Sequence, residues 1–188
     1  MSGERSAALS AVHVGAPTPL NAPIHLAPYN PAWPETYERL ASSIRQGLGD
    51  RVAKLHHAGS TSVPGLAAKP IIDIVLAVAD SADEAAYVAP LEARGWVLRI
   101  REPDWFDHRC LRHAAPASNL HVFSVGCPET GRMLAFRDHL RADAADRRLY
   151  ETTKRDLAAR TWGFTQDYAD AKSAVVADIM ARALKARA

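Results

Sequence analysis

The residues from Ile71 to Val78 form a nearly continuous run of β-branched and aliphatic side chains, and this run constrains the fold more than any other stretch. A strand without polar alternation needs cover on both faces of its sheet, so other elements must pack on each side. We therefore expect this strand at the centre of a sheet. Asp73 interrupts the run, and a buried carboxylate costs several kcal/mol unless it is paired or binds a metal.

Periodicity predicts the elements around this strand. From Trp33 to Leu48 apolar residues recur at three- and four-residue spacing, which predicts an amphipathic helix. Shorter apolar or alternating segments predict strands at 24–26, 51–57, 96–101, 106–112 and 119–125. Further helices are expected at 82–94, where Pro90 favours a break or kink, and at 132–142, 145–160 and 167–186. Strands mixed with clustered helices predict an α+β or α/β domain. Of these we expect the α+β class, with a mixed sheet flanked by helices and a helical C-terminal third.

Length and composition limit the domain organisation. A chain of 188 residues fits one folded domain with a substantial core. Residues 1–23 carry Pro17, Pro19 and Pro23 among small side chains without an apolar period. We therefore expect a flexible N-terminal arm at 1–23, followed by a single domain over 24–188.

Charge and targeting signals exclude several classes of partner. The formal net charge of +2 carries no strong signal for nucleic acid. No stretch approaches the roughly 18 consecutive apolar residues of a membrane span, and the first residues lack the pattern of a secretory signal. The sequence thus predicts a cytoplasmic protein without a membrane partner. Two cysteines, Cys110 and Cys127, are too few for a disulfide framework.

The turn from Gly59 to Ser62 is rich in groups that bind anions. Gly59 permits a sharp turn after the preceding strand, and Ser60, Thr61 and Ser62 place hydroxyl and N–H groups where a short helix begins. Such a helix start binds phosphate, and Lys69 is expected at the mouth of the same pocket. Two simpler interpretations stay open: the turn is an ordinary helix cap, or Asp73 caps it or pairs with Lys69 or an arginine.

The stretch from His57 to Ile74, HAGSTSVPGLAAKPIIDI, resembles the signature of the GrpB family, a branch of the nucleotidyltransferase fold superfamily. The resemblance extends over about residues 26 to 186 and leaves out only the N-terminal arm. It is carried further by Tyr29–Pro34, Leu120–Val122, Phe136–Arg141 and Tyr168–Lys172. It implies a nucleotidyltransferase-like core whose Gly-Ser turn faces a nucleoside triphosphate.

The resemblance also implies a metal site. The wider superfamily carries two acids at alternate strand positions, which point to one side and hold divalent cations. Here the second position is Val75, a gap that GrpB relatives share. His121 lies on the strand that resembles the one bearing a third acid, and imidazole is either a metal ligand or a general base. The family often has further histidines just before it, where this chain has Ser118 and Asn119. Asp73 and His121 are therefore the expected catalytic and metal-binding residues, with Mg²⁺ or Mn²⁺ as the cation, although a lone histidine in a strand is also a common structural residue.

Several other side chains are candidates for the pocket. Arg109 and Arg112 lie on a strand that is expected near His121, where they either bind phosphate or form a solvated face. Lys172 reaches either the nucleotide or solvent. Asp107 is a candidate for the missing acid, and His57 precedes the turn while its neighbour His56 points the other way. The expected phosphate-binding set is Gly59, Ser60, Thr61, Ser62, Lys69, Arg109 and Lys172.

Three functions are compatible with the sequence. The first is a metal-dependent enzyme that transfers a nucleotidyl or phosphoryl group to a small molecule or a protein, with Ser60 holding the triphosphate and Asp73 the metal. The second is a nucleotide-binding or accessory module that has lost metal chemistry, for which Val75 is the main support. GrpB-like domains also occur fused to dephospho-coenzyme A kinase, which is compatible with either. The third is a metal-binding protein built on His56, His57, His108, His113 and His121. The acceptor and the oligomeric state are not indicated by the sequence.

Overall fold

A five-stranded mixed β-sheet is the centre of the computed structural model, which describes residues 7 and 9–185. Its order is β1-β2-β5-β4-β3; β2 and β5 are parallel, and the other neighbouring pairs are antiparallel. The α+β class is thereby confirmed. The strands are β1 (Lys54–Ala58), β2 (Ile72–Val78), β3 (Trp96–Glu102), β4 (His108–His113) and β5 (Ser118–Ser124).

The apolar run that we placed at the centre of the sheet is β2, one position away from the centre. β5 is the middle strand, because it pairs in parallel with β2 on one side and antiparallel with β4 on the other. β3 lies outside β4, at the edge of the sheet. β2 still has a strand on each side and cover on both faces, with Asp73 as its one residue that is not fully buried. Its apolar composition is therefore explained by burial rather than by the central position.

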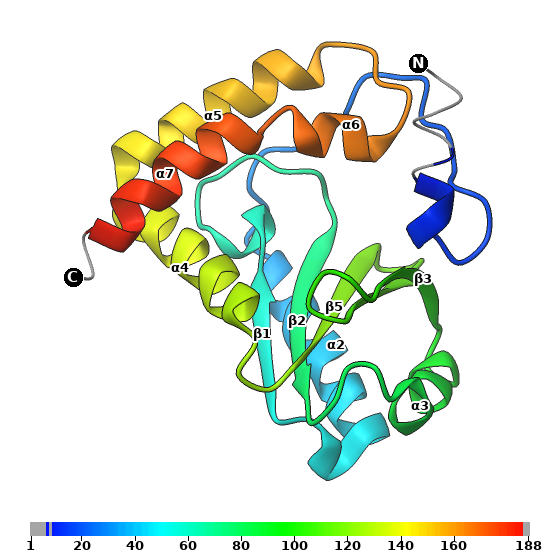
Figure 1. Ribbon diagram of the computed structural model, residues 1–188. Coiled ribbons are helices and arrows are strands. Elements are labelled where there is room, and N and C mark those ends of the chain that lie inside the picture. Colours follow the sequence, from blue (N-terminus) through cyan, green and yellow to red (C-terminus); the bar gives the residue numbers. More distant parts are fainter. Residues whose placement is uncertain (1–6, 8, 186–188) are drawn as a thin grey trace.

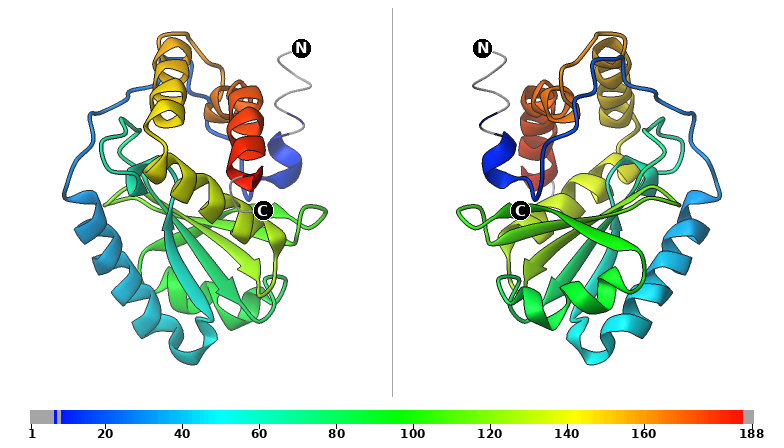
Figure 2. Two further views of the ribbon diagram at one scale, coloured as in Figure 1. Left: turned by 90° about the vertical axis from the view of Figure 1, so that its left-hand side faces the viewer. Right: turned by 90° about the vertical axis from the view of Figure 1, so that its right-hand side faces the viewer.

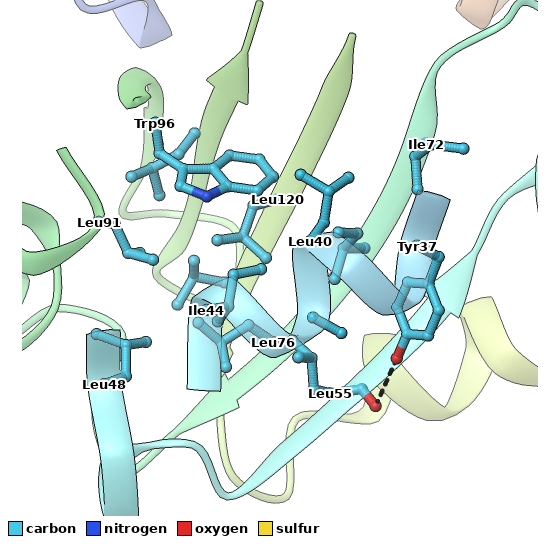
Figure 3. Close-up of a cluster of buried hydrophobic side chains, with 14 of the residues drawn as sticks. Tyr37, Leu40, Ile44, Leu48, Leu55, Ile72, Leu76, Leu91, Trp96 and Leu120 are labelled. Atoms are coloured by element: carbon cyan, nitrogen blue, oxygen red, sulfur yellow. Dashed lines mark hydrogen bonds between the residues drawn. The ribbon is translucent and has the colours of Figure 1, made fainter. Parts of the chain in front are cut away.

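One face of the sheet is covered by α2 (Trp33–Leu48) and α3 (Val88–Glu92). The predicted helix at 33–48 is confirmed with its exact bounds, and its apolar stripe packs on the strands in the main core (Figure 3). Tyr37 closes this layer, since its buried hydroxyl donates to the carbonyl of Leu55 at 3.2 Å. The helix expected at 82–94 is instead a 3₁₀ turn at Glu84–Ala86 followed by α3, in which Pro90 occupies the first turn.

The other face of the sheet meets α4 (Pro128–Ala142), and α5 (Ala144–Ala158) and α7 (Ser173–Lys185) pack on α4, with the last helices beyond the end of the sheet in both views of Figure 2. The helical C-terminal third is confirmed. The helix predicted at 167–186 is two helices, with a turn at residues 171 and 172 between them, and Ala186 lies outside the described residues. The C-terminal helices also include α6 (Thr165–Asp170), and all are labelled in Figure 1.

The described part of the N-terminal segment packs against the edge of the sheet. Leu9 is 6% exposed, and the N–H of Val14 donates to the carbonyl of Arg99 in β3 at 2.8 Å. This packing differs from the flexible arm expected at 1–23, because Leu9 is buried and Val14 packs against the main core. The composition of the segment does not indicate these contacts. Residues 1–6 and 8 lie outside the described residues.

Residues 24–26 do not form the strand that their composition predicts. Ile24 packs against Leu157 and Tyr168, and next to this segment Ala27 makes an isolated bridge to Ala68. Among the described residues, no helix has the length and apolar character needed to cross a membrane.

Candidate functional site

Gly59 and Asp73 are in contact at the end of β1. The register places Ala58 opposite Asp73, so the turn after β1 begins directly beside the carboxylate. Gly59 has φ +64°, and a Cβ at this position would collide with the Asp73 side chain. Only glycine satisfies both the backbone conformation and the close approach. The sharp turn that the sequence predicts is therefore present, and the carboxylate is the group that it accommodates.

Side-chain hydrogen bonds hold the turn in place. A 3₁₀ turn spans Ser60–Ser62, as expected for a short helix start. The hydroxyl of Ser62 donates to the carbonyl of Gly59 at 2.6 Å, and that of Thr61 donates to the carbonyl of Ile71 at 3.3 Å. From α4, Arg141 donates twice to the carbonyl of Ser62, at 2.9 and 2.8 Å. The hydroxyl of Ser62 thus stabilises the turn, and Ser62 does not line the cavity in which we expected it.

A small cavity of about 170 Å³ opens beside this turn and contains three lysines; we call it the lysine cavity. Lys154 of α5 is 2% exposed, and its ammonium donates to the hydroxyl of Ser60 at 3.1 Å and to the carbonyl of Ala67. Lys69 and Lys172 line the same cavity. The complete lining is Leu26, Gly59, Ser60, Thr61, Ala68, Lys69, Ile71, Asp73, Asn119, Tyr150, Lys154, Tyr168 and Lys172.

The charges in the lysine cavity are unbalanced, because one carboxylate faces three ammonium groups. Burial, followed by the charge of Lys172, lowers the pKa of Lys154 to about 7. Burial also lowers the pKa of both Lys69 and Lys172, although Asp73 opposes the change. Cations whose pKa values fall in this way gain free energy when an anion binds beside them. The cavity is therefore suited to a ligand that carries negative charge.

Tyr168, which lines this cavity, carries an unsatisfied hydrogen-bonding group. Its side chain is 1% exposed, and its buried hydroxyl has no hydrogen-bond partner among the residues that the structure describes. The ammonium groups of Lys172 and Lys69 lie over the ring, 4.5 and 5.9 Å from its centroid. Burial raises the pKa of Tyr168 to about 12, so the hydroxyl keeps its proton and can donate it. Buried polar groups are nearly always satisfied, so this hydroxyl indicates a ligand atom or a water.

Asp73 lies where the lysine cavity meets the strands. The side-chain amide of Asn119 donates to Oδ1 of Asp73 at 2.8 Å, and Nε2 of His121 is 3.9 Å from the same oxygen. Burial raises the pKa of the carboxyl, but positive charge at His121, the hydrogen bond from Asn119 and the charge of Lys69 together outweigh this effect and leave the pKa below its ordinary value. Asp73 is therefore ionised, with its carboxylate available as a cation ligand. The 3.9 Å separation is too long for a hydrogen bond between Asp73 and His121.

His121 is supported by two residues that sequence reasoning did not assign to it. Nδ1 of His121 is 3.0 Å from Nε2 of His108, and Nδ1 of His108 is 2.7 Å from Oε2 of Glu102. Burial lowers the pKa of His108, although Glu102 opposes it. Cys110 pairs with His121, which by strand alternation places His108, two residues earlier on β4, on the same face of the sheet. This register is not contained in the sequence.

The same alternation corrects two expectations. Arg109 points to the opposite face of β4 from His121, where it is 7% exposed and its Nε donates to Glu84 at 2.6 Å. The structure therefore removes it from the phosphate-binding set, and Arg112 lines a cavity beside His121 instead. Asp107 does not supply a second acid, since it lies in the turn before β4, where its carbonyl accepts from Arg109.

Three further positions have clear places. Val75 shares the face of Asp73, where it packs with Ala58 and Phe123, so no second carboxylate stands there. His57 faces α2 and stacks on Tyr37, with a centroid distance of 4.8 Å. Of the five histidines of the third hypothesis, only His108 and His121 contact each other in the described part of the chain.

Lys154 and Tyr168 were not predicted as site residues. In α5, Lys154 follows Tyr150 by four residues and precedes Leu157 by three, so it lies on the buried stripe of that helix. A lysine on an apolar stripe is a signal that could have been used, because an ammonium there needs a buried acceptor. Tyr168 begins the segment Tyr168–Lys172, which carries part of the family resemblance, and its place there is the signal that could have been used.

Two larger cavities continue from the lysine cavity in succession, since the first shares lining residues with it and the second shares lining residues with the first. One of about 300 Å³ shares Gly59, Lys69, Asp73 and Asn119 with it and is also lined by His121. Another, of about 650 Å³, contains His108 and His121 together with Trp105 and Phe123. Described residues of the N-terminal segment, including Leu9 and His13, line both. Asp73 and His121 therefore lie between a cationic cavity and a more open aromatic one.

A second group of potential metal ligands lies apart from this site. His139, Asp143 and Asp146 each offer a donor atom, and these atoms lie within 4.8 Å of one another. Their atoms already have partners, because Asp146 accepts from Arg182 at 2.7 Å and from His139, while Asp143 accepts from the first N–H groups of α5. We interpret this group as a link between α4, α5 and α7.

Comparisons with known proteins agree with the expected family. The family model described as GrpB protein matches residues 23–182. A UPF0157 protein of Halalkalibacterium halodurans is 54% identical over 175 residues, which are 93% of this chain and 90% of that protein. A UPF0157 protein of Streptomyces coelicolor is 46% identical over 187 residues, covering 99% of this chain and 97% of that protein.

Two other similarities extend the comparison. A protein of Mycolicibacterium paratuberculosis named dephospho-CoA kinase is 30% identical, in an alignment that covers 86% of this chain but only 46% of that protein. The crystal structure of the conserved protein GrpB from Enterococcus faecalis aligns with a TM-score of 0.73 at 32% identity, over 87% of this chain and 99% of that chain. The family match, the relatives and the shared structure lead to one conclusion: this chain belongs to the GrpB family.

Proposed function

We propose that this protein binds a nucleoside triphosphate together with a divalent metal ion and transfers a nucleotidyl or phosphoryl group to a small molecule or a protein. The observation that carries the proposal is the position of the lysine cavity, which opens directly onto the ionised carboxylate of Asp73. Phosphoryl chemistry relies on positioning and charge neutralisation, and both need cations beside the phosphates and an acid that holds metal.

The sizes of the cavities support a division of labour. Sites that enclose a whole small-molecule ligand measure roughly 300–1,000 Å³. The lysine cavity, at about 170 Å³, is smaller than this and suits the phosphate groups alone. The adjoining cavity of about 300 Å³, and the cavity of about 650 Å³ that continues from it, have room for the remainder of the nucleotide and for an acceptor.

Five residues of the lysine cavity have a defined part in this proposal. Lys69, Lys154 and Lys172 neutralise phosphate oxygens, and Ser60 with the N–H groups at the start of its 3₁₀ turn positions them. The hydroxyl of Tyr168 donates the hydrogen bond that it does not make within the described part of the protein.

The donor set at Asp73 fits a divalent cation, because an ionised carboxylate and an imidazole nitrogen are 3.9 Å apart. Asp73 and His121 would hold the ion, and a bound ion would supply charge neutralisation at the reacting phosphate. His121 serves either as that ligand or as the base that accepts a proton from the acceptor. We further propose that the fold is that of the nucleotidyltransferase superfamily.

A second function is favoured by two specific observations. Val75 leaves Asp73 as the single acid of β2, and the relative named dephospho-CoA kinase is more than twice as long as the segment it shares with this chain. Both fit an accessory module that binds a nucleotide without turning it over. This alternative keeps the lysine cavity and dispenses with the metal.

Calorimetric titration of ATP, with and without Mg²⁺ or Mn²⁺, distinguishes the two functions. Asp73→Asn removes the charge with little change in shape. If the protein is a metal-dependent transferase, the wild type binds ATP more tightly with metal, and the variant loses this enhancement. Asp50→Asn, an exposed position in the turn after α2, is the matched control and should behave as the wild type. ATP binding that needs neither metal nor Asp73 would establish the accessory module instead.

A further inference from the structure

Behind His121 lies a chain of three side chains that ends in a carboxylate. His108 of β4 lies in the middle of this chain: its Nδ1 is 2.7 Å from a carboxylate oxygen of Glu102 of β3, and its Nε2 is 3.0 Å from Nδ1 of His121 of β5. His108 is 3% exposed, and its ring also stacks on Phe123 with a centroid distance of 4.8 Å. The chain comes from three adjacent strands and is held by the sheet itself.

The hydrogen-bonding capacities of these groups determine where the protons are. An ionised carboxylate only accepts, so Nδ1 of His108 must carry a proton and donate to Glu102. A second proton would charge a ring that is almost completely buried, so Nε2 of His108 retains its lone pair. That lone pair accepts from Nδ1–H of His121. In a neutral ring the other nitrogen, Nε2 of His121, is then unprotonated.

Nε2 of His121 therefore faces Asp73 as one acceptor faces another. The two atoms are 3.9 Å apart, and neither has a proton to give to the other. Metal–ligand distances for such atoms are about 2.1 Å, so one ion bound to both spans up to about 4.2 Å. The pair thus has both the electronic need for a cation and the spacing to hold one.

The types of donor also discriminate between cations. Mg²⁺ prefers oxygen ligands and near-ideal octahedral geometry, whereas imidazole nitrogen is a good ligand for transition metals. Val75 removes the second carboxylate that would favour a hard cation.

We propose that Glu102 and His108 are positioning residues that fix His121 as an imidazole ligand, and that Asp73 and His121 bind a divalent transition-metal ion in preference to Mg²⁺. The inference deepens the metal site of the proposed function and rests on it. His121 then serves as a ligand and not as the proton acceptor.

Mn²⁺ alone tests this inference on the full-length protein without nucleotide. We expect Mn²⁺ to bind at least about tenfold more tightly than Mg²⁺, measured by the signal of free Mn²⁺ and by competition. Pulsed electron paramagnetic resonance should detect coupling to ¹⁴N in the bound ion. His121→Ala should remove that coupling. His108→Phe, which keeps an aromatic ring but cannot accept a hydrogen bond, should weaken Mn²⁺ binding about 10–100-fold.

Two variants separate positioning from folding. Glu102→Gln keeps an acceptor oxygen for His108 and should retain Mn²⁺ binding, whereas Glu102→Leu should lose most of it. His113→Phe, at the other end of β4, is the matched control and should bind as the wild type does. Equal affinity for Mg²⁺ and Mn²⁺, a missing ¹⁴N coupling in the wild type, or unchanged binding by His108→Phe would each overturn the inference. Because nucleotide is absent, these results are independent of the ATP titrations.

Discussion

At the scale of single residues, the site depends on side chains whose surroundings change their ordinary chemistry. Gly59 is required by Asp73, and Lys154 is a buried cation whose hydrogen-bond partners among the described residues are neutral oxygen atoms. The first is a steric requirement and the second an electrostatic one. Each leads to a separate prediction, and neither depends on the identity of the ligand.

Gly59→Ala should destabilise the protein by roughly 1–3 kcal/mol, because alanine strains the left-handed backbone and its Cβ collides with Asp73. Gly65→Ala is the matched control: Gly65 has φ +77°, and a Cβ added there would meet no atom within 4 Å, so this variant should show the backbone strain alone. Denaturant unfolding measures both. A cost for Gly59→Ala that is no larger than that of Gly65→Ala would contradict the steric role of the carboxylate.

Lys154 should make stability depend on pH. Its pKa is about 7 in the folded protein and about 10.5 when unfolded, so between these values the unfolded state binds one more proton. Stability attributable to this group therefore rises with pH from about 7 to about 10.5 and is flat below 7, with a slope of roughly 1 kcal/mol per pH unit. We expect the free energy of unfolding of the wild type, minus that of Lys154→Met, to increase from pH 7 to pH 9. A difference that stays constant over this interval would show that the ammonium is not desolvated.

At the scale of elements, α2 is the most regular part of the fold. Its stripe is continuous with the sheet core, and Ile44 is completely buried between them. Ile44→Ala should lower the free energy of unfolding by about 2–5 kcal/mol, because it leaves a cavity that the strands cannot fill. Leu149→Ala in α5 is the control, since Leu149 is 46% exposed and should change stability by less than about 0.5 kcal/mol. Chemical denaturation of the two variants checks this, and similar losses in both would contradict the layer assignment.

Elements with strong periodicity were predicted well, and those that depend on distant partners were not. The helix at 33–48 follows from its own apolar spacing, and the Gly59 turn from glycine followed by hydroxyl residues. The segment at 24–26 has the composition of a strand, yet Ile24 packs against α5 and α6, so tertiary contacts decide its state. The packing of the N-terminal segment was not predicted for a similar reason. Its described residues, among them His13 and Val14, pair with β3 at the edge of the sheet, which is distant in the sequence.

At the scale of the whole molecule, the candidate site is assembled from segments that are far apart in the chain. Lys69 follows the Gly59 turn, Lys154 comes from α5, and Lys172 from the turn between α6 and α7. The C-terminal helices therefore bring two of the three ammonium groups to the cavity that Asp73 also lines. The N-terminal segment closes the opposite side, where it lines the two larger cavities.

The sequence by itself determined the local chemistry: the Gly59 turn, the lone acid in an apolar strand, the helix at 33–48 and the family. These follow from spacing and residue type, which act over a few neighbouring residues. Only the tertiary structure decided which face each side chain occupies. It turned Arg109 away to Glu84, joined His108 and Glu102 to His121, and buried Lys154 against Ser60. The physical reason is that strand order and register, which no local pattern contains, select the partners of every residue on the sheet.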